Sequence, residues 1–274
     1  MKVVLVGGGS MVTKLTKKFS TEVIDTRFGP QKVHRAIIKD LNVYSIHRHD
    51  DHHTVPAHAV NYKRIIETAR LLEADLVVGI SICGAISRNF SVGDIIAYDQ
   101  IFDFTKSRSQ SFYDDKSEVR HANMANPVCP SAFAFFEKVF SQQSVIGDKP
   151  SIIWGGIMVG IDGPRMSTKA EVKFFDMLDA ATINMSCVPE AFLAREAGLC
   201  YLGVSLVSDA EYENDGHNDM VLIAHNVSRN EPEMLEVIDL VLEKAPSFKN
   251  YQNCSCKSAF DKALFKIDNP VNEN

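Results

Sequence analysis

The sequence lacks the features of several classes of protein. No apolar stretch reaches the length of a membrane helix, and the short run over residues 3–6 enters glycines at once, unlike a signal peptide. Lys and Arg number 29 against 35 Asp and Glu, without a Lys- or Arg-rich run, which argues against a broad nucleic-acid face. The six cysteines include no Cys-x-x-Cys pair, so neither a disulfide-built scaffold nor a zinc finger is indicated. We expect a cytoplasmic protein with neither a membrane nor a nucleic-acid partner.

What the sequence has is the composition of a globular domain: 274 residues, 45% hydrophobic and 23% charged. Short apolar runs alternate with amphipathic helical stretches, which is typical of an α/β domain around a largely buried sheet. Strands are predicted over 3–6, 76–82, 94–98, 152–161 and 199–207, and helices over 60–72, 190–197 and 232–244. Because no internal repeat or linker is evident, we predict a single domain over residues 1–274.

A glycine-rich turn follows the first predicted strand. The glycines at 7–9 let backbone N–H groups approach an anion, and Ser10 adds a hydroxyl. The dinucleotide fingerprint fails because Val12 stands where its last glycine belongs, and the Gly-Lys-Ser/Thr of a P-loop is missing. The turn is therefore either an anion-binding loop or a structural turn.

Residues 47–54 read His-Arg-His-Asp-Asp-His-His-Thr. Imidazoles and carboxylates bind transition metals, but contiguous side chains diverge, so we predict a solvated polar loop and no metal site. Arg48 is a planar forked donor suited to phosphate oxygens, and His49 stands beside it.

Several motifs stand in an order that is shared with a known family. They are Gly8-Gly9-Ser10, Arg48-His49, Val60-Asn61-Tyr62, Gly93-Asp94-Ile95-Ile96, and the segments 110–114, 163–171 and 184–190. In this order they resemble the motifs of the trimeric purine nucleoside phosphorylases, and they look most like the 5'-methylthioadenosine phosphorylase branch. The resemblance covers about residues 1–245 and leaves 246–274 as a carboxy-terminal extension.

The resemblance implies an α/β domain with a mixed central sheet flanked by helices, assembled as a homotrimer or a dimer of trimers. It implies reversible phosphorolysis, in which inorganic phosphate attacks the anomeric carbon of a purine nucleoside. Phosphate is then a co-substrate, and neither a metal nor an organic cofactor is implied. The transition state is an oxocarbenium sugar between an anionic nucleophile and a purine that gains negative charge. The residues that match the phosphate site of the family are Ser10, Arg48, His49, Ser81 and Ser186.

The base and ribose site also follows from the resemblance. The residues that match this site are Ile82, Cys83, Gly84, Met166, Ser167, Met185 and Asp209. The catalytic residues that the resemblance implies are the acids Asp209 and Glu211, together with His49. Asp209 matches the acid that contacts N7 and the amino group of adenine, although taken alone it also reads as a helix or turn cap. To donate to N7 the carboxyl must be protonated, which requires a pKa above its model value of about 3.9.

Two departures favour a 6-aminopurine over a 6-oxopurine. Relatives that prefer 6-oxopurines have Asn at the position of Asp209, because an amide can pair with both N7 and O6. They also have Glu where this sequence has Ser167. We therefore expect cleavage of 5'-methylthioadenosine to adenine and 5-methylthioribose 1-phosphate, a step of purine and methionine salvage. The alternatives are a phosphorylase of adenosine, inosine, guanosine or methylthioinosine, or a nucleoside-binding protein without catalysis.

The 5' end of the substrate and the carboxy-terminal cysteines are less determined. Either Ala224 or His225 falls in the 5' pocket, depending on a one-residue shift in the alignment to the family's last large helix. His121 resembles a histidine that such enzymes lend to the sugar pocket of a neighbouring subunit. The extension contains Cys254-Ser255-Cys256, which is similar to a Cys-x-Cys that forms a disulfide in some archaeal relatives. Reduced thiols are the alternative that a cytoplasmic chain favours.

Overall fold

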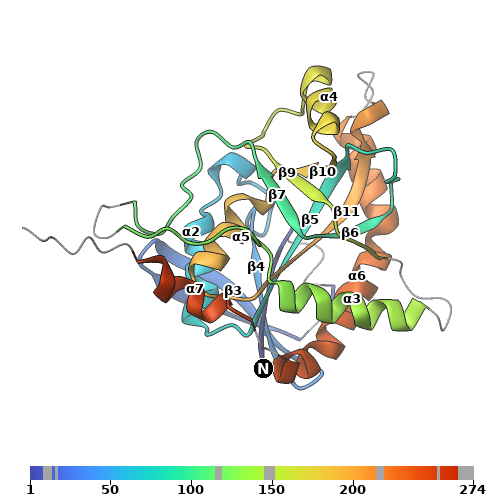
Figure 1. The fold of residues 1–274 in the computed structure, drawn as a ribbon. Coiled ribbons are helices and arrows are strands. Elements are labelled where there is room, and N and C mark those ends of the chain that lie inside the picture. Colours follow the sequence, from blue (N-terminus) through green and yellow to red (C-terminus); the bar gives the residue numbers. More distant parts are fainter. Residues whose placement is uncertain are drawn as a thin grey trace, which may run out of the picture.

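An eleven-stranded sheet is the centre of the computed structural model (Figure 1). The structure describes residues 1–8, 14–15, 18–114, 119–144, 152–213, 219–251 and 254–264. The strands are β1 Lys2–Gly7, β2 Ser20–Thr26, β3 Gly29–Ile38, β4 Leu41–His47, β5 Leu76–Ala85, β6 Ile95–Tyr98, β7 Gln100–Asp103, β8 Ile152–Trp154, β9 Ile157–Gly160, β10 Ala180–Asn184 and β11 Tyr201–Ala210. The helices are η1 Ala57–Ala59, α2 Tyr62–Leu71, α3 Pro130–Ser144, α4 Lys169–Met177, α5 Cys187–Glu196, η2 Glu211–Glu213, α6 Met220–Tyr251 and α7 Cys256–Ala263.

The sheet is mixed, and β5 is its branching strand. One path runs β2-β3-β4-β1-β5-β10-β9-β7, while β11 pairs with β5 and continues to β6 and β8. The pairs β4-β1, β1-β5 and β5-β11 are parallel, whereas β10 meets the far end of β5 antiparallel. The expected α/β domain with a mixed central sheet is confirmed.

Helices cover both faces of the sheet because alternate residues of the buried strands point to opposite sides. On β1, Val4 and Val6 belong to the core under α2 and α5, while Val3 and Leu5 belong to the core under α3 and α6. The predicted apolar face of the last large helix is also confirmed, since Met234 on α6 is fully buried in the second core. No helix of the described residues combines the length and apolarity that a bilayer crossing requires.

The parallel strands bring polar residues to one edge of the sheet. β1 ends at Gly7, and the backbone N–H of Arg48, just after β4, donates to the Gly7 carbonyl at 3.0 Å. The ends of β5 and β11 pair side by side, with Asp209 opposite Gly84 after a register shift. This shared edge brings together predicted site residues at the ends of β4, β5 and β11.

Two predicted elements differ most in extent from the structure, while the others differ by up to three residues at an end. The single strand expected over 152–161 is divided into β8 and β9 at Gly155 and Gly156, whose φ angles of 90° and 126° interrupt the extended backbone. The helix expected over 232–244 extends from Met220 to Tyr251 and contains Pro232 in its interior. Since α6 passes through residue 245, it also spans the expected start of the carboxy-terminal extension.

Candidate active site

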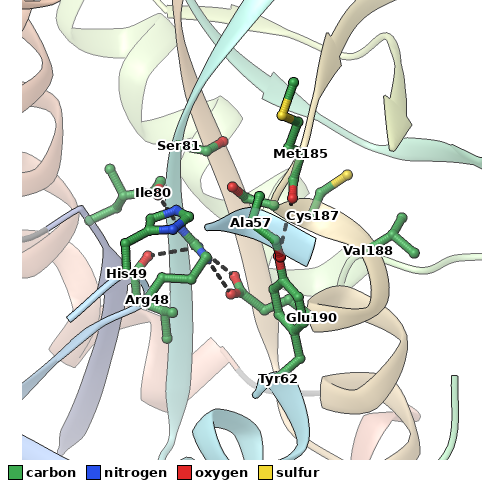
Figure 2. Close-up of polar contacts among 12 residues, drawn as sticks. Arg48, His49, Ala57, Tyr62, Ile80, Ser81, Met185, Cys187, Val188 and Glu190 are labelled. Atoms are coloured by element: carbon green, nitrogen blue, oxygen red, sulfur yellow. Dashed lines mark hydrogen bonds and ion pairs between the residues drawn. The ribbon is translucent and has the colours of Figure 1, made fainter. Parts of the chain in front are cut away.

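Arg48 is the centre of a buried ion pair (Figure 2). Its Nε and Nη2 donate to the two carboxylate oxygens of Glu190 on α5, both at 2.9 Å. Nη1 donates to the carbonyl of Ile80 at 3.1 Å and Nη2 to that of Val6 at 3.2 Å. These four bonds use four of the five N–H groups of a guanidinium, which leaves one N–H on Nη1 for a further acceptor.

Glu190 keeps Arg48 charged although both side chains are buried. Burial alone lowers the pKa of Arg48, but the charge and hydrogen bonds of Glu190 outweigh it and raise the pKa above its usual value. The hydroxyl of Tyr201 also donates to Glu190, at 2.9 Å, and itself contacts the hydroxyl of Tyr98 at 3.2 Å. Glu190, itself fixed by Tyr201, therefore holds the Arg48 guanidinium in one orientation.

His49 lies next to this pair as a neutral imidazole. Its Nδ1 contacts the carbonyl of Val55 at 2.9 Å, and since a carbonyl only accepts, Nδ1 carries the proton. Burial lowers the pKa of His49 to about 4 despite this bond, with the positive charge of Arg48 acting in the same direction. Nε2 is then an acceptor at neutral pH, suited to a protonated oxygen of an anion.

The lowered pKa of His49 predicts a pH-dependent stability. Between about pH 6.5, the model value, and about pH 4 the folded chain binds fewer protons than the unfolded chain, so the free energy of unfolding falls as the pH is lowered. His49→Gln removes this contribution, and its urea midpoint is expected to vary less across that window than that of the wild type. The exposed His58 supplies the control His58→Gln. Equal slopes for both variants would contradict the assignment.

Asn184 connects two of the predicted phosphate ligands. Its side-chain nitrogen donates to Ser81 Oγ at 3.1 Å, and its oxygen accepts from the backbone N–H of Ser186 and of Cys187, both at 3.1 Å. Ser81 Oγ also contacts Ser205 Oγ at 2.5 Å. Ser186 precedes the first residue of α5, and no hydrogen bond of its side chain to a described residue is found. Asn184 thus ties Ser81 on β5 to the backbone at the start of α5.

Asp209 and Glu211 lie together over Gly84. A Cβ atom placed on Gly84 would lie 2.7 Å from Glu211 Cγ and 2.9 Å from Asp209 Oδ2, so only glycine leaves room for both carboxyl groups. The side chain of Asp209 accepts from Ser208 Oγ at 2.6 Å through Oδ1, whereas Oδ2 is buried with no partner among the described residues. Burial raises the pKa of Asp209, and the Ser208 bond opposes that rise.

Met185 is held between the two halves of the site. Its carbonyl accepts from the hydroxyl of Tyr62 at 3.1 Å, and its sulfur packs so closely on Gly163 that a Cβ there would collide with it. Gly163 adopts a φ of 68°, which begins the turn that leads to Met166 and Ser167, both half-buried. The expected neighbourhood of Met185 and the Gly-Pro segment is therefore present.

The remaining predicted residues differ in their placement. Cys83 is buried with its thiol toward the carbonyl of Leu206, while Ile82 is 38% exposed. His121, Ala224 and His225 are exposed in the single chain. Ser10 lies outside the described residues. A cavity of about 440 Å³ lies between α4 and η2. Among its lining residues, only Glu211 belongs to the predicted site.

The loop at 47–54 differs in part from the prediction. His47 is buried, and its Nδ1 contacts Asp51 at 2.6 Å, with His34 of β3 at 3.3 Å from the same carboxylate oxygen. A three-residue group of metal-ligand type thus forms, although Lys32 also pairs with Asp51 and supplies the compensating charge. The divergence of contiguous side chains did not exclude this group, because its third residue, His34, comes from the neighbouring strand β3.

A family model described as the phosphorylase superfamily matches residues 2–243. The chain belongs to the phosphorylase superfamily. The family resemblance of its motifs is therefore confirmed.

Relatives within the superfamily carry two kinds of name. The chain is 32% identical to the S-methyl-5'-thioadenosine phosphorylase of Thermofilum pendens, over 96% of this chain and 98% of that protein. It is 30% identical to a probable 6-oxopurine nucleoside phosphorylase of Dictyoglomus turgidum, over 94% of this chain and 96% of that protein. A methylthioadenosine phosphorylase from an antarctic soil metagenomic library has the same fold, with a TM-score of 0.86 over 97% of this chain and 93% of that one, at 24% identity.

Several groups that hold the candidate site together have no local signal of that role in the sequence. Glu190 falls in a quoted motif, but its partner Arg48 is 142 residues away, and no local pattern joins them. The same is true of Asn184, which joins β10 to the serine of β5. A charged residue among apolar neighbours, such as Glu190 in the segment 187–194 of α5, is the signal that could have indicated a buried pair.

Proposed function

We propose that this chain catalyses the reversible phosphorolysis of 5'-methylthioadenosine to adenine and 5-methylthioribose 1-phosphate. The observation that carries the proposal is Asp209, a buried carboxyl with a raised pKa and an Oδ2 atom that has no partner among the described residues. Such a group can hold a proton at neutral pH and donate it to a purine nitrogen. The relatives named for methylthioadenosine support the same substrate.

Phosphate binding is assigned to Ser10, Arg48, His49, Ser81 and Ser186. Arg48 offers its one uncommitted N–H from a guanidinium that Glu190 already orients, so little side-chain entropy is lost when the anion binds. The neutral His49 accepts a hydrogen bond from a protonated oxygen of the incoming phosphate through Nε2, which helps to orient the nucleophile. The serine hydroxyls donate to the other phosphate oxygens.

Bond cleavage is assigned to the opposite end of the site. As the bond between N9 and the anomeric carbon breaks, electron density moves into the purine, and protonation of N7 by Asp209 stabilises the departing base. Glu211 lies beside Asp209 over Gly84 and sustains its protonation. Met185 supports the ribose and base, with Ile82, Cys83, Gly84, Met166 and Ser167 completing the walls. Phosphate is the co-substrate, and the reaction as proposed requires neither a metal nor an organic cofactor.

The active form is proposed to be a cytoplasmic homotrimer or a dimer of trimers. Ala224 and His225 near the start of α6 and His121 are all exposed in the single chain. A neighbouring subunit that covers them would complete the pocket for the 5' substituent, with His121 contributed across the interface. The apolar side chains of Met220 and Val221, 66% and 79% exposed, support such a cover.

The test is release of free base from 5'-methylthioadenosine, adenosine and inosine, each with and without phosphate. Phosphate-dependent release of adenine, fastest from methylthioadenosine, is the expected result. Faster turnover of inosine would leave the reaction class in place and favour the 6-oxopurine activity named for some relatives. Release without phosphate would indicate a hydrolase, and binding without turnover a nucleoside-binding protein.

A further inference from the structure

Four cysteines from three distant parts of the sequence meet at one point outside the candidate active site. Their Sγ atoms all lie within 4.8 Å of one another, and three of the four side chains are buried. The four-thiol cluster consists of Cys129, Cys200, Cys254 and Cys256. Cys129 comes directly before α3, Cys200 directly before β11, and the last two stand at the start of α7. A backbone hydrogen bond from the Cys129 N–H to the Tyr201 carbonyl, at 2.9 Å, holds Cys129 beside Cys200.

The spacing of these thiols fits tetrahedral coordination. A zinc ion with Zn–S bonds of about 2.3 Å places its four sulfurs about 3.8 Å apart. The Sγ atoms of Cys200 and Cys254 are 3.4 Å apart, and no pair in the cluster exceeds 4.8 Å. The pair distances therefore bracket the value that tetrahedral coordination requires.

The surroundings of the cluster suit thiolates. Arg195, on the buried side of α5, directs Nη1 to Cys256 Sγ at 3.2 Å. The backbone N–H of Ala132, in the first turn of α3, points to Cys129 Sγ at 3.5 Å. Zn²⁺ with four thiolates carries two net negative charges, so a buried cation and N–H donors are the neighbours that such a centre needs.

We propose that the four-thiol cluster binds one zinc ion as a structural site. On binding, each of the four thiols releases one proton and forms one Zn–S bond, and no electrons are transferred. The site is independent of the proposed function, because none of its residues belongs to the candidate active site.

The proposed zinc ion would fasten the carboxy-terminal part of the chain to the body of the domain. Arg195 also donates to Ser255 Oγ at 3.3 Å and to the Asn123 carbonyl at 3.4 Å. At the other end of α7, Leu264 forms a β-bridge with Arg120. The metal site therefore positions α7, and through α7 the segment at 120–123 that carries His121.

The test measures metal content of the full chain, purified without a metal-binding tag and in the presence of a thiol reductant. After removal of metal and reconstitution with Zn²⁺ under reducing conditions, we expect one zinc per chain to survive gel filtration against a competing chelator. Reconstitution with Co²⁺ should give the intense thiolate charge-transfer and d–d bands of tetrahedral Co²⁺. Zinc should also raise the melting temperature of the reduced protein.

Cys129→Ser and Cys200→Ser are expected to lose the bound zinc and the cobalt spectrum, whereas Cys83→Ser, whose thiol lies outside the cluster, should retain both. The wild-type measurement does not depend on whether the variants fold. A wild type that retains no zinc while its thiols remain reduced overturns the proposal. So does a mass two hydrogens lower per linked pair after purification without reductant, together with no zinc uptake after reduction, since the cluster would then be a disulfide site.

Discussion

Asp209→Asn is expected to lower kcat for phosphorolysis of methylthioadenosine by about 100- to 10,000-fold, the usual contribution of a general acid. The reason is the state of the carboxyl: burial raises its pKa, and Oδ2 has no partner among the described residues. Asparagine keeps the shape and an N–H donor but has no proton to transfer. Because an amide can pair with both N7 and O6, the turnover of inosine relative to methylthioadenosine should rise.

Steady-state rates with both nucleosides, at saturating phosphate, measure this effect. Asp25→Asn on β2 is the matched control, since this carboxylate is exposed and distant in the sheet order from β11. It should turn over methylthioadenosine as the wild type does. Unchanged adenine release by Asp209→Asn would remove Asp209 from the reaction, whatever the result with inosine.

Glu190→Gln is expected to lower the free energy of unfolding by about 3–5 kcal/mol, because it leaves the charge of a buried guanidinium without compensation. The Arg48 and Glu190 side chains are 2% and 0% exposed, so water cannot replace the lost carboxylate. Without the Glu190 carboxylate, Arg48 also loses its fixed orientation, so the KM for phosphate should rise. Urea midpoints at a fixed protein concentration, together with phosphate titrations, measure the two effects.

Asp239→Asn provides the control, since its partner Lys39 lies on the surface and such pairs contribute about 0–1 kcal/mol. The double variant Arg48→Met/Glu190→Leu isolates the cause. If the cost comes from an unpaired buried charge, this apolar pair should be more stable than Glu190→Gln alone, although it cannot bind phosphate as the wild type does. Equal destabilisation by Glu190→Gln and Asp239→Asn would show that the buried Arg48–Glu190 pair contributes no more to stability than a surface ion pair.

The sequence predicted best the elements with a strong apolar pattern. The first halves of β1 and β5 are rich in buried apolar residues, and α2 shows its apolar residues at helical spacing, so local patterns were sufficient. The strands β2 to β4 were not predicted. On β2, half-buried residues alternate with exposed ones, of which Thr21 and Asp25 are polar, and no residue is fully buried, so the segment lacks the apolar pattern of a strand.

Short motifs indicated the candidate site residues Arg48 and Asp209, but they did not indicate the contacts that hold these residues in place. The Arg48–Glu190 pair and the bond from Asn184 to Ser81 join residues more than a hundred positions apart. The four-thiol cluster is a similar case, because sequence spacing shows only the adjacent Cys254 and Cys256, and the chain path around α3 and β11 brings in the others. Such groups depend on tertiary structure.

The branching strand β5 has a consequence for the length of the substrate. Ser81, assigned to phosphate, and Gly84, under the base-binding carboxyls, are three residues apart on this one strand. At about 3.3 Å per residue, the backbone sets the two ends about 10 Å apart. The distance between the sites assigned to phosphate and to the base is thus set by the covalent geometry of β5. This strand is hydrogen-bonded to neighbouring strands on both edges. Substitutions that change the preferred purine or 5' group can accumulate around β5 while the span across the cleaved bond stays the same.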